Sequence, residues 1–442
     1  MVVSARKARK NLSADALFHM LRSAFDRIPD PRKDEPDISL GNALMAGFAM
    51  FSLKDPSLLA FDERRRDPTD NFRTIYGIDR VPCDTQMRAI LDPVEPDQLQ
   101  PLFGDVFRRL QRGKALERFA YLDDHYLVSL DGTTYFSSTK VHCASCLEKH
   151  HRGGGVTYSH QLLGATLVHP DLKEVIPLAP EPIINQDGHT KNDCERNATR
   201  RWLQHFRQEH PHLLVIIIED GLSAKAPHLR DLREAHVHYI IGVKPGDHAF
   251  LFQHLRDADA AGQTQHLTQV DPATGVLHHF RWHHAVPLNE SNPDELVNVL
   301  EYWEIKADGT MQYFSWISDL PLLPDTVYAV MRGGRARWKI ENETFNTLKN
   351  QGYHLEHNYG HGEQNLSVVL VLLMMLAFLV DQTQQLCCPL FQAAWDKMGS
   401  KRHLWEQIRI HFHTFVFTSM ADLLTTLIRG IVRQVPVLQD SS

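Results

Sequence analysis

A short unbroken run of apolar residues constrains the fold of this 442-residue chain more than any other feature. Residues 213–218 (LLVIII) are all aliphatic and are followed by Glu219, Asp220 and Gly221. Such a run, ended by turn residues, is typical of a strand buried on both faces of a sheet. Other elements must then cover both faces, which predicts an α/β fold.

The segments around this run predict a mixed sheet. Further strand patterns occur at 126–131, 161–168, 174–178 and 238–243. Helical patterns occur at 192–209 and through Leu229 and Leu232. Residues 248–320 instead hold short alternating pieces between turn signals, which indicate a β-rich insertion. Residues 325–382 and the tail to 435 are again helical in pattern.

The first 118 residues have helical periodicity and slightly more basic than acidic side chains. Basic patches at 6–10, 64–66 and 108–114 would suit phosphate contact, or would be solvated helix faces. The whole chain has a formal net charge of −7. This charge excludes a uniformly basic coat but allows a local basic groove for nucleic acid.

Cysteine usage and hydropathy predict a cytoplasmic protein without a membrane partner. The six cysteines suggest no disulfide framework, and no apolar segment of signal-peptide type follows the basic N-terminus. The longest apolar run, 368–380, is shorter than the roughly 20 residues that a membrane-spanning helix needs. It is apolar nearly all round, so we expect a buried core helix.

Two aspartates follow predicted strands, where ligand sites form in α/β sheets. Asp131 ends the first predicted strand and Asp220 follows the buried run. On neighbouring strands their carboxylates would converge and repel each other, and a divalent cation would relieve the repulsion. Oxygen-only ligands favour Mg²⁺, with Mn²⁺ as a substitute. Alternatively, each aspartate is a helix cap or turn residue.

A third acid lies in the predicted helix 335–349. Arg337, Glu341 and Phe345 share one side of that helix, whereas Glu343 points away. Arg337 and Glu341 could form only an ion pair within the helix. The other interpretation makes Glu341 a third metal ligand, with Arg337 and Lys349 directed at phosphates. Three such acids are typical of two-metal phosphoryl transfer.

Four pieces of sequence resemble the DDE transposases of insertion sequences, and most closely the insertion sequence 4-like group with its Tyr-Arg-Glu-Lys signature. They are residues 129–133 (SLDGT), 218–222 (IEDGL), 337–342 (RWKIEN) and 350–362 (NQGYHLEHNYGHG). The resemblance covers roughly 120–380 and includes the β-rich insertion. Gly334 stands where the signature tyrosine would fall, and Lys349 comes one residue later than the signature lysine.

The resemblance implies an RNase H-like mixed-sheet core whose catalytic metal ligands are Asp131, Asp220 and Glu341. It implies a DNA transposase that binds the inverted ends of its element, cleaves DNA and joins the 3′-hydroxyl to target DNA. A synaptic complex implies a homodimer on double-stranded DNA, in a prokaryotic cytoplasm. The expected DNA contacts are Arg335, Arg337, Lys339, Lys349 and Lys244.

The expected domain organisation has five segments. Residues 1–118 form a helical DNA-binding region, and 119–247 form the first part of the core. The β-rich insertion spans 248–322, the second part of the core spans 323–385, and 386–442 form a C-terminal helical region.

Three smaller features carry their own alternatives. Cys143 and Cys146 could bind zinc together with His142, His150, His151, His189 or Cys194, or they could be metal-free loop thiols. Trp282, Trp303 and Trp316 could stack on a DNA base but more often fill a core. The basic loop with Lys140, Lys149 and Arg152 could contact DNA or be a solvated hairpin tip.

Two other functions fit the same residues. A structure-specific nuclease would use the same core and the same acids. A catalytically inactive DNA-binding protein derived from a transposase would not need three intact acids, and Asp131, Asp220 and Glu341 argue against it. The 337–342 piece favours the transposase over the nuclease.

Overall fold

The computed structural model describes residues 10–32, 36–66, 70–185 and 194–430, which form two compact units. The first unit comprises residues 1–115, 350–354 and 359–442, and the second comprises 116–349 and 355–358. The chain therefore passes into the second unit at residue 116 and returns at 350, and residues 355–358 again belong to the second unit.

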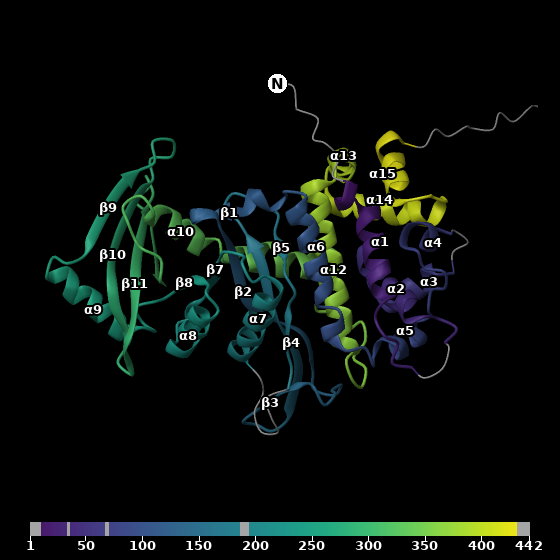
Figure 1. Ribbon diagram of the computed structural model, residues 1–442, viewed down its shortest axis with the longest axis horizontal. Helices are drawn as coiled ribbons and strands as arrows, with labels where there is room; N and C mark the ends of the chain where they lie inside the picture. The colour runs from purple at the N-terminus through teal and green to yellow at the C-terminus, as the bar shows by residue number, and fades with distance from the viewer. Residues whose placement is uncertain (1–9, 33–35, 67–69, 186–193, 431–442) are drawn as a thin grey trace, which may run out of the picture. The chain divides into compact units, whose positions relative to one another are not determined.

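The described part of the first unit is helical (Figure 1). Its elements are η1 (Lys10–Leu12), α1 (Ala14–Phe25), α2 (Leu40–Ser52), α3 (Leu58–Arg64), α4 (Asn71–Tyr76), α5 (Asp84–Leu91), η2 (Pro96–Gln98), α6 (Pro101–Arg112), α12 (Leu366–Cys387), α13 (Pro389–Met398), α14 (Lys401–Thr414) and α15 (Met420–Arg429). Serines cap α1, α2, α3, α14 and α15 by accepting a backbone N–H of the first turn, which satisfies a donor that the helix cannot pair itself.

Helix α12 is the core helix of this unit. All of its residues are buried, and it packs against α2, α6 and α13. The predicted buried helix is thus confirmed, but it has 22 residues rather than the 13 of the apolar run. By length and composition alone it could cross a membrane. Its burial and the charged pair of Asp381 with Lys54 are instead typical of a packed core helix.

The second unit is built on one mixed sheet of twelve strands (Figure 1). Its strands are β1 (Ala120–Tyr121), β2 (His125–Ser138), β3 (Leu147–His150), β4 (Val156–Val168), β5 (Ile176–Pro177), β6 (Glu181–Ile183), β7 (Val215–Glu219), β8 (His238–Gly242), β9 (Gln265–Val270), β10 (Leu277–Asn289), β11 (Asn292–Ile305) and β12 (Met311–Ser318). Its helical segments are η3 (Leu116–Phe119), η4 (Leu122–Asp124), α7 (Glu195–Glu209), η5 (Gly221–Ser223), α8 (Ala226–Glu234), α9 (Ala249–Ala260), α10 (Val327–Arg335), η6 (Ile340–Phe345) and α11 (Asn346–Asn350).

The strand order is β3-β4-β2-β7-β8-β12-β11-β10-β9, with β1 beside β2 and with β5 and β6 beside β4. Strands β2, β7 and β8 pair in parallel, and the other pairs are antiparallel. The predicted mixed α/β fold is confirmed. The apolar run forms β7, every residue of which is buried. The strands predicted as a β-rich insertion are β9–β12, and they continue this sheet because β12 pairs with β8.

Two strands are longer than the sequence patterns predict. β2 continues to Ser138 rather than ending at Asp131, and β4 begins at Val156 rather than Gln161. The two extensions pair with each other as far as Ser138 and Tyr158, across an irregularity between Thr134 and Phe136. Each extension supplies the other's backbone hydrogen bonds, so mutual pairing overrides the polar pattern of both segments.

Candidate active site

Asp131 lies within β2 and not at its end, which corrects the sequence-based prediction. At Asp131, however, β2 has no paired strand on the side of β7. The parallel ladder between β2 and β7 runs from the Tyr126–Val215 pair to the Ser129–Ile218 pair. Asp131 lies two residues beyond that last pair, so β2 has lost its β7 neighbour at this point.

Asp220 directly follows β7, as predicted. Continuing the parallel register by two residues from Ser129 and Ile218 places Asp131 beside Asp220. The Asp220 carboxylate accepts the backbone N–H of Leu222 at 2.9 Å and caps η5. Asp220 therefore has the predicted capping role, which engages one oxygen of a carboxylate that lies at the sheet edge.

Glu341 lies on η6, which is a π-helical segment rather than the predicted α-helix. Its side chain is 37% exposed. π-helical turns widen a helix locally and occur frequently at functional sites. The wider turn leaves the Glu341 carboxylate accessible while Ile340 and Phe345 on the same segment are buried.

Contacts with β2 and β4 hold η6 over the face of the sheet that carries Asp131. Gly164, which pairs with Asp131, leaves room for the Phe345 ring, because a Cβ at this glycine would come within 2.8 Å of the ring. The Ser129 hydroxyl donates to the Arg337 carbonyl at 3.2 Å. Small residues on the strands thus set the distance between η6 and Asp131.

The Arg337 guanidinium bridges two of the three acids. Its Nη1 lies 2.9 Å from Glu341 Oε1 and 3.5 Å from Asp131 Oδ2. The same guanidinium lies 4.5 Å above the ring of Trp338, which is 51% exposed. Arg337 is therefore more than the predicted partner of Glu341, because it also provides positive charge to Asp131.

The surroundings of Asp131 disfavour its charged form. Burial, together with the nearby carboxylates of Glu341, Glu195 and Asp220, raises the pKa of Asp131 to about 7 against the opposing effect of Arg337. Four carboxylates thus act on one another electrostatically. One guanidinium cannot balance four negative charges, and a divalent cation would reduce the remaining negative charge.

Glu195 is an acid that the sequence interpretation missed. It begins α7, and a Cβ at Gly132 would come within 2.2 Å of its carboxylate, so this side chain occupies the space that Gly132 leaves empty. Burial raises the pKa of Glu195, and the charges of Asp220 and Glu219 add to the effect. No spacing rule pointed to Glu195, although the glycine directly after Asp131 indicated that something approaches closely there.

A buried hydrogen-bonded pair, Glu219 and His228, holds the end of β7 next to Asp220. His228 of α8 donates from Nε2 to the Glu219 carboxylate at 2.6 Å. Burial alone would lower the pKa of His228, but Glu219 outweighs burial and raises it. The pair anchors α8 against the strand that carries Asp220.

The residues predicted to contact DNA have protein partners, with one exposed exception. The Arg335 guanidinium lies 2.5 Å from the Glu304 carboxylate. Lys339 donates to the Leu172 carbonyl at 2.7 Å. The Lys349 ammonium lies 2.8 Å from the Glu356 carboxylate. Lys244 is exposed at the turn after β8. Arg335 and Lys339 also line a hollow of about 290 Å³ with Arg332.

Trp316 leaves no room for a side chain at position 334. A Cβ at this position would come within 2.4 Å of Trp316 Nε1. Trp316 is buried on β12, so the indole occupies the space that a tyrosine at 334 would need. Trp282 is buried as well, and Trp303 lies under the Arg281 guanidinium at 5.4 Å. The exposed tryptophan near the acids is Trp338, which the sequence interpretation did not select.

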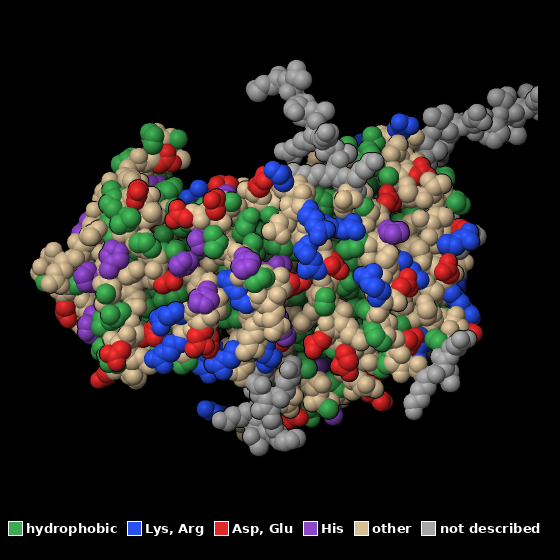
Figure 2. All heavy atoms as spheres, in the orientation of Figure 1, with side chains coloured by type: hydrophobic (Ala, Val, Ile, Leu, Met, Phe, Trp, Pro, Cys, Tyr) green, Lys and Arg blue, Asp and Glu red, His purple; other side chains and the backbone are tan. Residues whose placement is uncertain are grey.

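The basic patches of the N-terminal region are only partly available to a partner. Arg65 and Arg66 pair with Asp62, and Arg108 pairs with Asp105. Arg112 and Lys114 at the end of α6 are exposed, and Figure 2 shows a group of Lys and Arg side chains over α6. The patch at 6–10 and His189 lie outside the residues whose side chains the structure describes.

The two loop cysteines lie together, and the histidine next to them is His160 of β4. Each Sγ lies within 3.5 Å of His160 Nε2. The candidate partners from the sequence are engaged differently: His142 stacks on Tyr158, His150 faces Glu148, and His151 contacts Thr157. Cys194 is an exposed cap of α7.

Comparison with known families gives these acids a context. Residues 169–379 match the family described as the transposase DDE domain. This match supports a DDE transposase. It includes Asp220 and Glu341 and begins after Asp131. No curated protein matches the chain.

Among solved structures, similarity is found to the cryo-EM structure of a piggyBac transposase synaptic complex with hairpin DNA. The identity is 11%, the TM-score is 0.36, and the match covers 98% of this chain and 82% of that chain. A likeness at this score supports no further inference.

Proposed function

We propose that this protein is a DNA transposase whose catalytic metal ligands are Asp131, Asp220 and Glu341 on an RNase H-like core. The observation that carries the proposal is the convergence of acids from β2, the end of β7 and η6, with Arg337 between two of them. The transposase DDE match over 169–379 supports the same function.

The donor set fits hard divalent cations. All candidate ligands are carboxylate oxygens, which Mg²⁺ and Mn²⁺ prefer. Bound there, two such ions would activate an attacking oxygen and stabilise a leaving one in an in-line displacement. Asp131, Asp220 and Glu341 would hold them, and Glu195 is an additional acid within reach of the same charges.

The protein's own groups prepare this site for DNA. Arg337 holds Asp131 and Glu341 in place, and its guanidinium is suited to phosphate oxygens once cations neutralise the carboxylates. Trp338 exposes an aromatic face beside it, on which an unpaired base could stack. Exposed Lys244 and the cations of the α6 end are candidate backbone contacts.

The finer assignments rest on the sequence resemblance. We place the chain in the insertion sequence 4-like group, with a helical DNA-binding region at 1–118. We expect it to act on double-stranded DNA, at the inverted ends of its element and at a target site. We also expect a homodimer when both ends are held, in the cytoplasm of a prokaryote.

A structure-specific nuclease is the alternative that uses the same acids. Both enzymes cleave DNA, and only the transposase joins the new 3′-hydroxyl to a second DNA molecule. The reaction product therefore distinguishes a transposase from a nuclease. The absence of any cleavage would identify an inactive DNA-binding protein.

The test uses a plasmid that carries the coding region with its native flanking DNA. Purified protein and Mg²⁺ should break this plasmid at the element's boundaries and join the ends to a second plasmid. Asp131→Asn, Asp220→Asn and Glu341→Gln should each reduce cleavage by at least about 10³-fold, because each removes a metal ligand. Band-shift binding of the flanking DNA should persist in all three.

Glu343→Gln is the matched control, because it removes an acid two residues from Glu341 on the same π-helical segment. It should cleave normally. Cleavage lost in Glu343→Gln but retained in Glu341→Gln would refute the assignment of the third acid. Cleavage without joining would favour the nuclease.

A further inference from the structure

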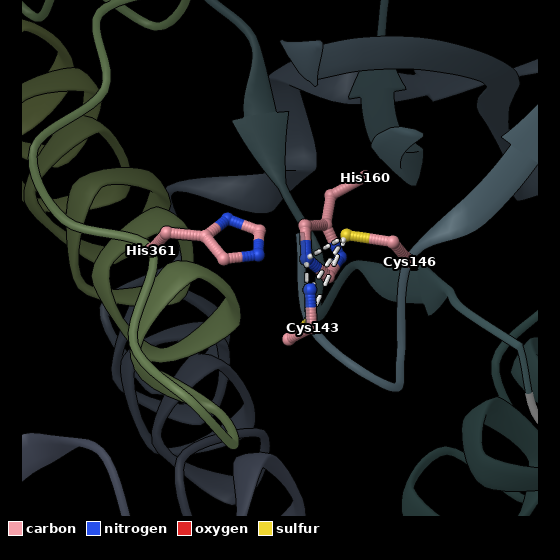
Figure 3. A group of neighbouring side chains, drawn as sticks. All are labelled: Cys143, Cys146, His160 and His361. Carbon is pink, nitrogen blue, oxygen red and sulfur yellow. Dashed lines mark hydrogen bonds between the residues drawn. The ribbon is translucent and has the colours of Figure 1, made fainter. Parts of the chain in front are cut away.

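We propose that Cys143, Cys146 and His160 form a structural Zn²⁺ site in the second unit, separate from the carboxylate site. The two cysteines belong to the loop between β2 and β3, and His160 belongs to β4. Figure 3 shows the three side chains converging. Strand pairing brings them together, because His160 pairs with Phe136 near the end of β2.

The distances match a tetrahedral zinc ion. Cys143 Sγ and Cys146 Sγ are 3.9 Å apart, and they lie 3.5 and 3.4 Å from His160 Nε2. With Zn–S bonds of about 2.3 Å and Zn–N bonds of about 2.0–2.1 Å, a tetrahedron separates the sulfur atoms by about 3.8 Å and each sulfur from the nitrogen by about 3.6 Å. A single ion can therefore bind all three atoms without rearrangement of the side chains.

One backbone donor is placed to support a thiolate ligand. The backbone N–H of Cys143 is directed at Cys146 Sγ at 3.5 Å, and such donors stabilise a bound thiolate. Cys146 and His160 are buried, whereas Cys143 is half-buried and leaves an approach for the ion. Structural zinc sites are four-coordinate, so a further ligand comes from outside these three residues.

A disulfide is the competing use of the two cysteines, and the geometry favours the metal. The sulfur atoms are not bonded, and both lie within 3.5 Å of His160 Nε2. A thiol pair aimed at a histidine nitrogen is a metal-ligand arrangement. The function of the ion would be structural: it would fasten the β2–β3 loop to β4, next to the strand that carries Asp131.

The full chain, purified under reducing conditions without added metal, should contain about one zinc per molecule by elemental analysis. Cys143→Ser, Cys146→Ser and His160→Gln should each lose most of it. His150→Gln and Cys83→Ser are matched controls and should retain it. Asp131→Asn should also retain it, which separates this site from the proposed catalytic one.

Two measurements on the wild type do not depend on variants that fold poorly. After removal of zinc, Co²⁺ should give the thiolate charge-transfer band and the intense visible bands of a tetrahedral site. Zinc should also protect Cys143 from alkylation while exposed Cys194 reacts. A zinc-free protein that gives no such cobalt spectrum, a Cys143–Cys146 disulfide in the reduced preparation, or full zinc in His160→Gln would each overturn the proposal.

Discussion

At the scale of single residues, the arrangement around Asp131 depends on its glycine neighbours. Gly132, directly after Asp131, leaves space for the Glu195 carboxylate. Gly164, on the paired strand β4, leaves space for the Phe345 ring. A larger side chain at either position would push an acid or the η6 segment away from the site. The short piece 129–133 therefore matters for its lack of bulk as well as for its carboxylate.

Glu195 gives the first prediction at this scale. If it shares the cations with Asp131 and Asp220, Glu195→Gln should lower cleavage by roughly 10–100-fold, which is the size of effect expected for a group that supports a metal site. Titration of Mn²⁺ by calorimetry should show weaker binding in the same variant. Glu209→Gln, at the other end of α7, should leave both unchanged. Normal cleavage in Glu195→Gln would assign this acid to packing only.

Residue-scale prediction from the sequence succeeded where a residue's neighbours are local and failed where they come from distant elements. The Arg337–Glu341 pair follows from helical spacing and is present. His160 and Glu195 were missed because the register of β4 and the position of α7 bring them to their partners, and neither spacing is periodic in the sequence. The lack of space for a side chain at position 334, beside Trp316, likewise depends on tertiary packing.

At the scale of elements, α12 shows how a long apolar helix accepts charge. Lys54 Nζ lies 2.5 Å from Asp381 Oδ2 and sits over the rings of Tyr353 and Trp405 at 3.9 and 4.1 Å. The Tyr353 hydroxyl also donates to Asp381. Because both charges are buried away from water, each depends on the other to offset its desolvation penalty.

The Lys54–Asp381 pair predicts that removing one of the two charges destabilises the fold more than replacing both. Asp381→Ala should lower the free energy of unfolding by about 3–5 kcal/mol, because it leaves the Lys54 ammonium buried without its anion. The double variant Lys54→Met, Asp381→Leu should be more stable than Asp381→Ala. Urea denaturation followed by tryptophan fluorescence measures both, with exposed Asp396→Ala expected within about 0.5 kcal/mol of the wild type. A loss below about 1 kcal/mol in Asp381→Ala would contradict the account.

The junction of β8 and β12 predicts a pH dependence. The hydrogen bond from His238 Nδ1 to Asp319, 2.8 Å long, raises the pKa of His238 in the folded protein. Because the folded pKa is the higher one, the pair stabilises the fold fully below the unfolded pKa of about 6.5 and is lost as the pH rises through the folded value.

His238→Gln should therefore cost more stability at about pH 6 than at about pH 8, with a difference below about 1 kcal/mol because the pair is partly exposed. The measurement is urea denaturation at the two pH values, with His254→Gln on α9 as the control. An equal cost at both values would show that the charge of His238 does not contribute.

Elements themselves were predictable to different degrees. The pattern of β7 is unambiguous because burial on both faces leaves no polar residue in the strand. β2 and β4 were predicted too short because their polar extensions are fixed by mutual pairing. The π-helical form of η6 has no sequence signal that we could use, since its residues are compatible with an α-helix.

At the scale of the whole molecule, the DNA binding that we propose for this acidic chain would depend on local charge. The net charge is −7, and Figure 2 shows acidic and basic side chains interspersed over the visible face. Phosphate contacts release counterions, so affinity should fall steeply with salt, with a slope of about −0.9 per phosphate in a plot of log K against log salt.

Arg112→Gln and Lys114→Gln at the end of α6 should each reduce this slope by about 1, if this region binds DNA as we propose. Lys306→Gln, exposed in the turn between β11 and β12, is the control. Band shifts of the flanking DNA across a salt series provide the slopes. A flat salt response would contradict binding along the phosphate backbone.

The most direct test of the account is the position of Mn²⁺ in crystals of the protein, located by anomalous diffraction. We predict manganese bound between Asp131 and Asp220, with Glu341 at the same site and the Arg337 guanidinium displaced from the carboxylates. Carboxylates that stay apart with no manganese between them at saturating concentration would contradict the central claim.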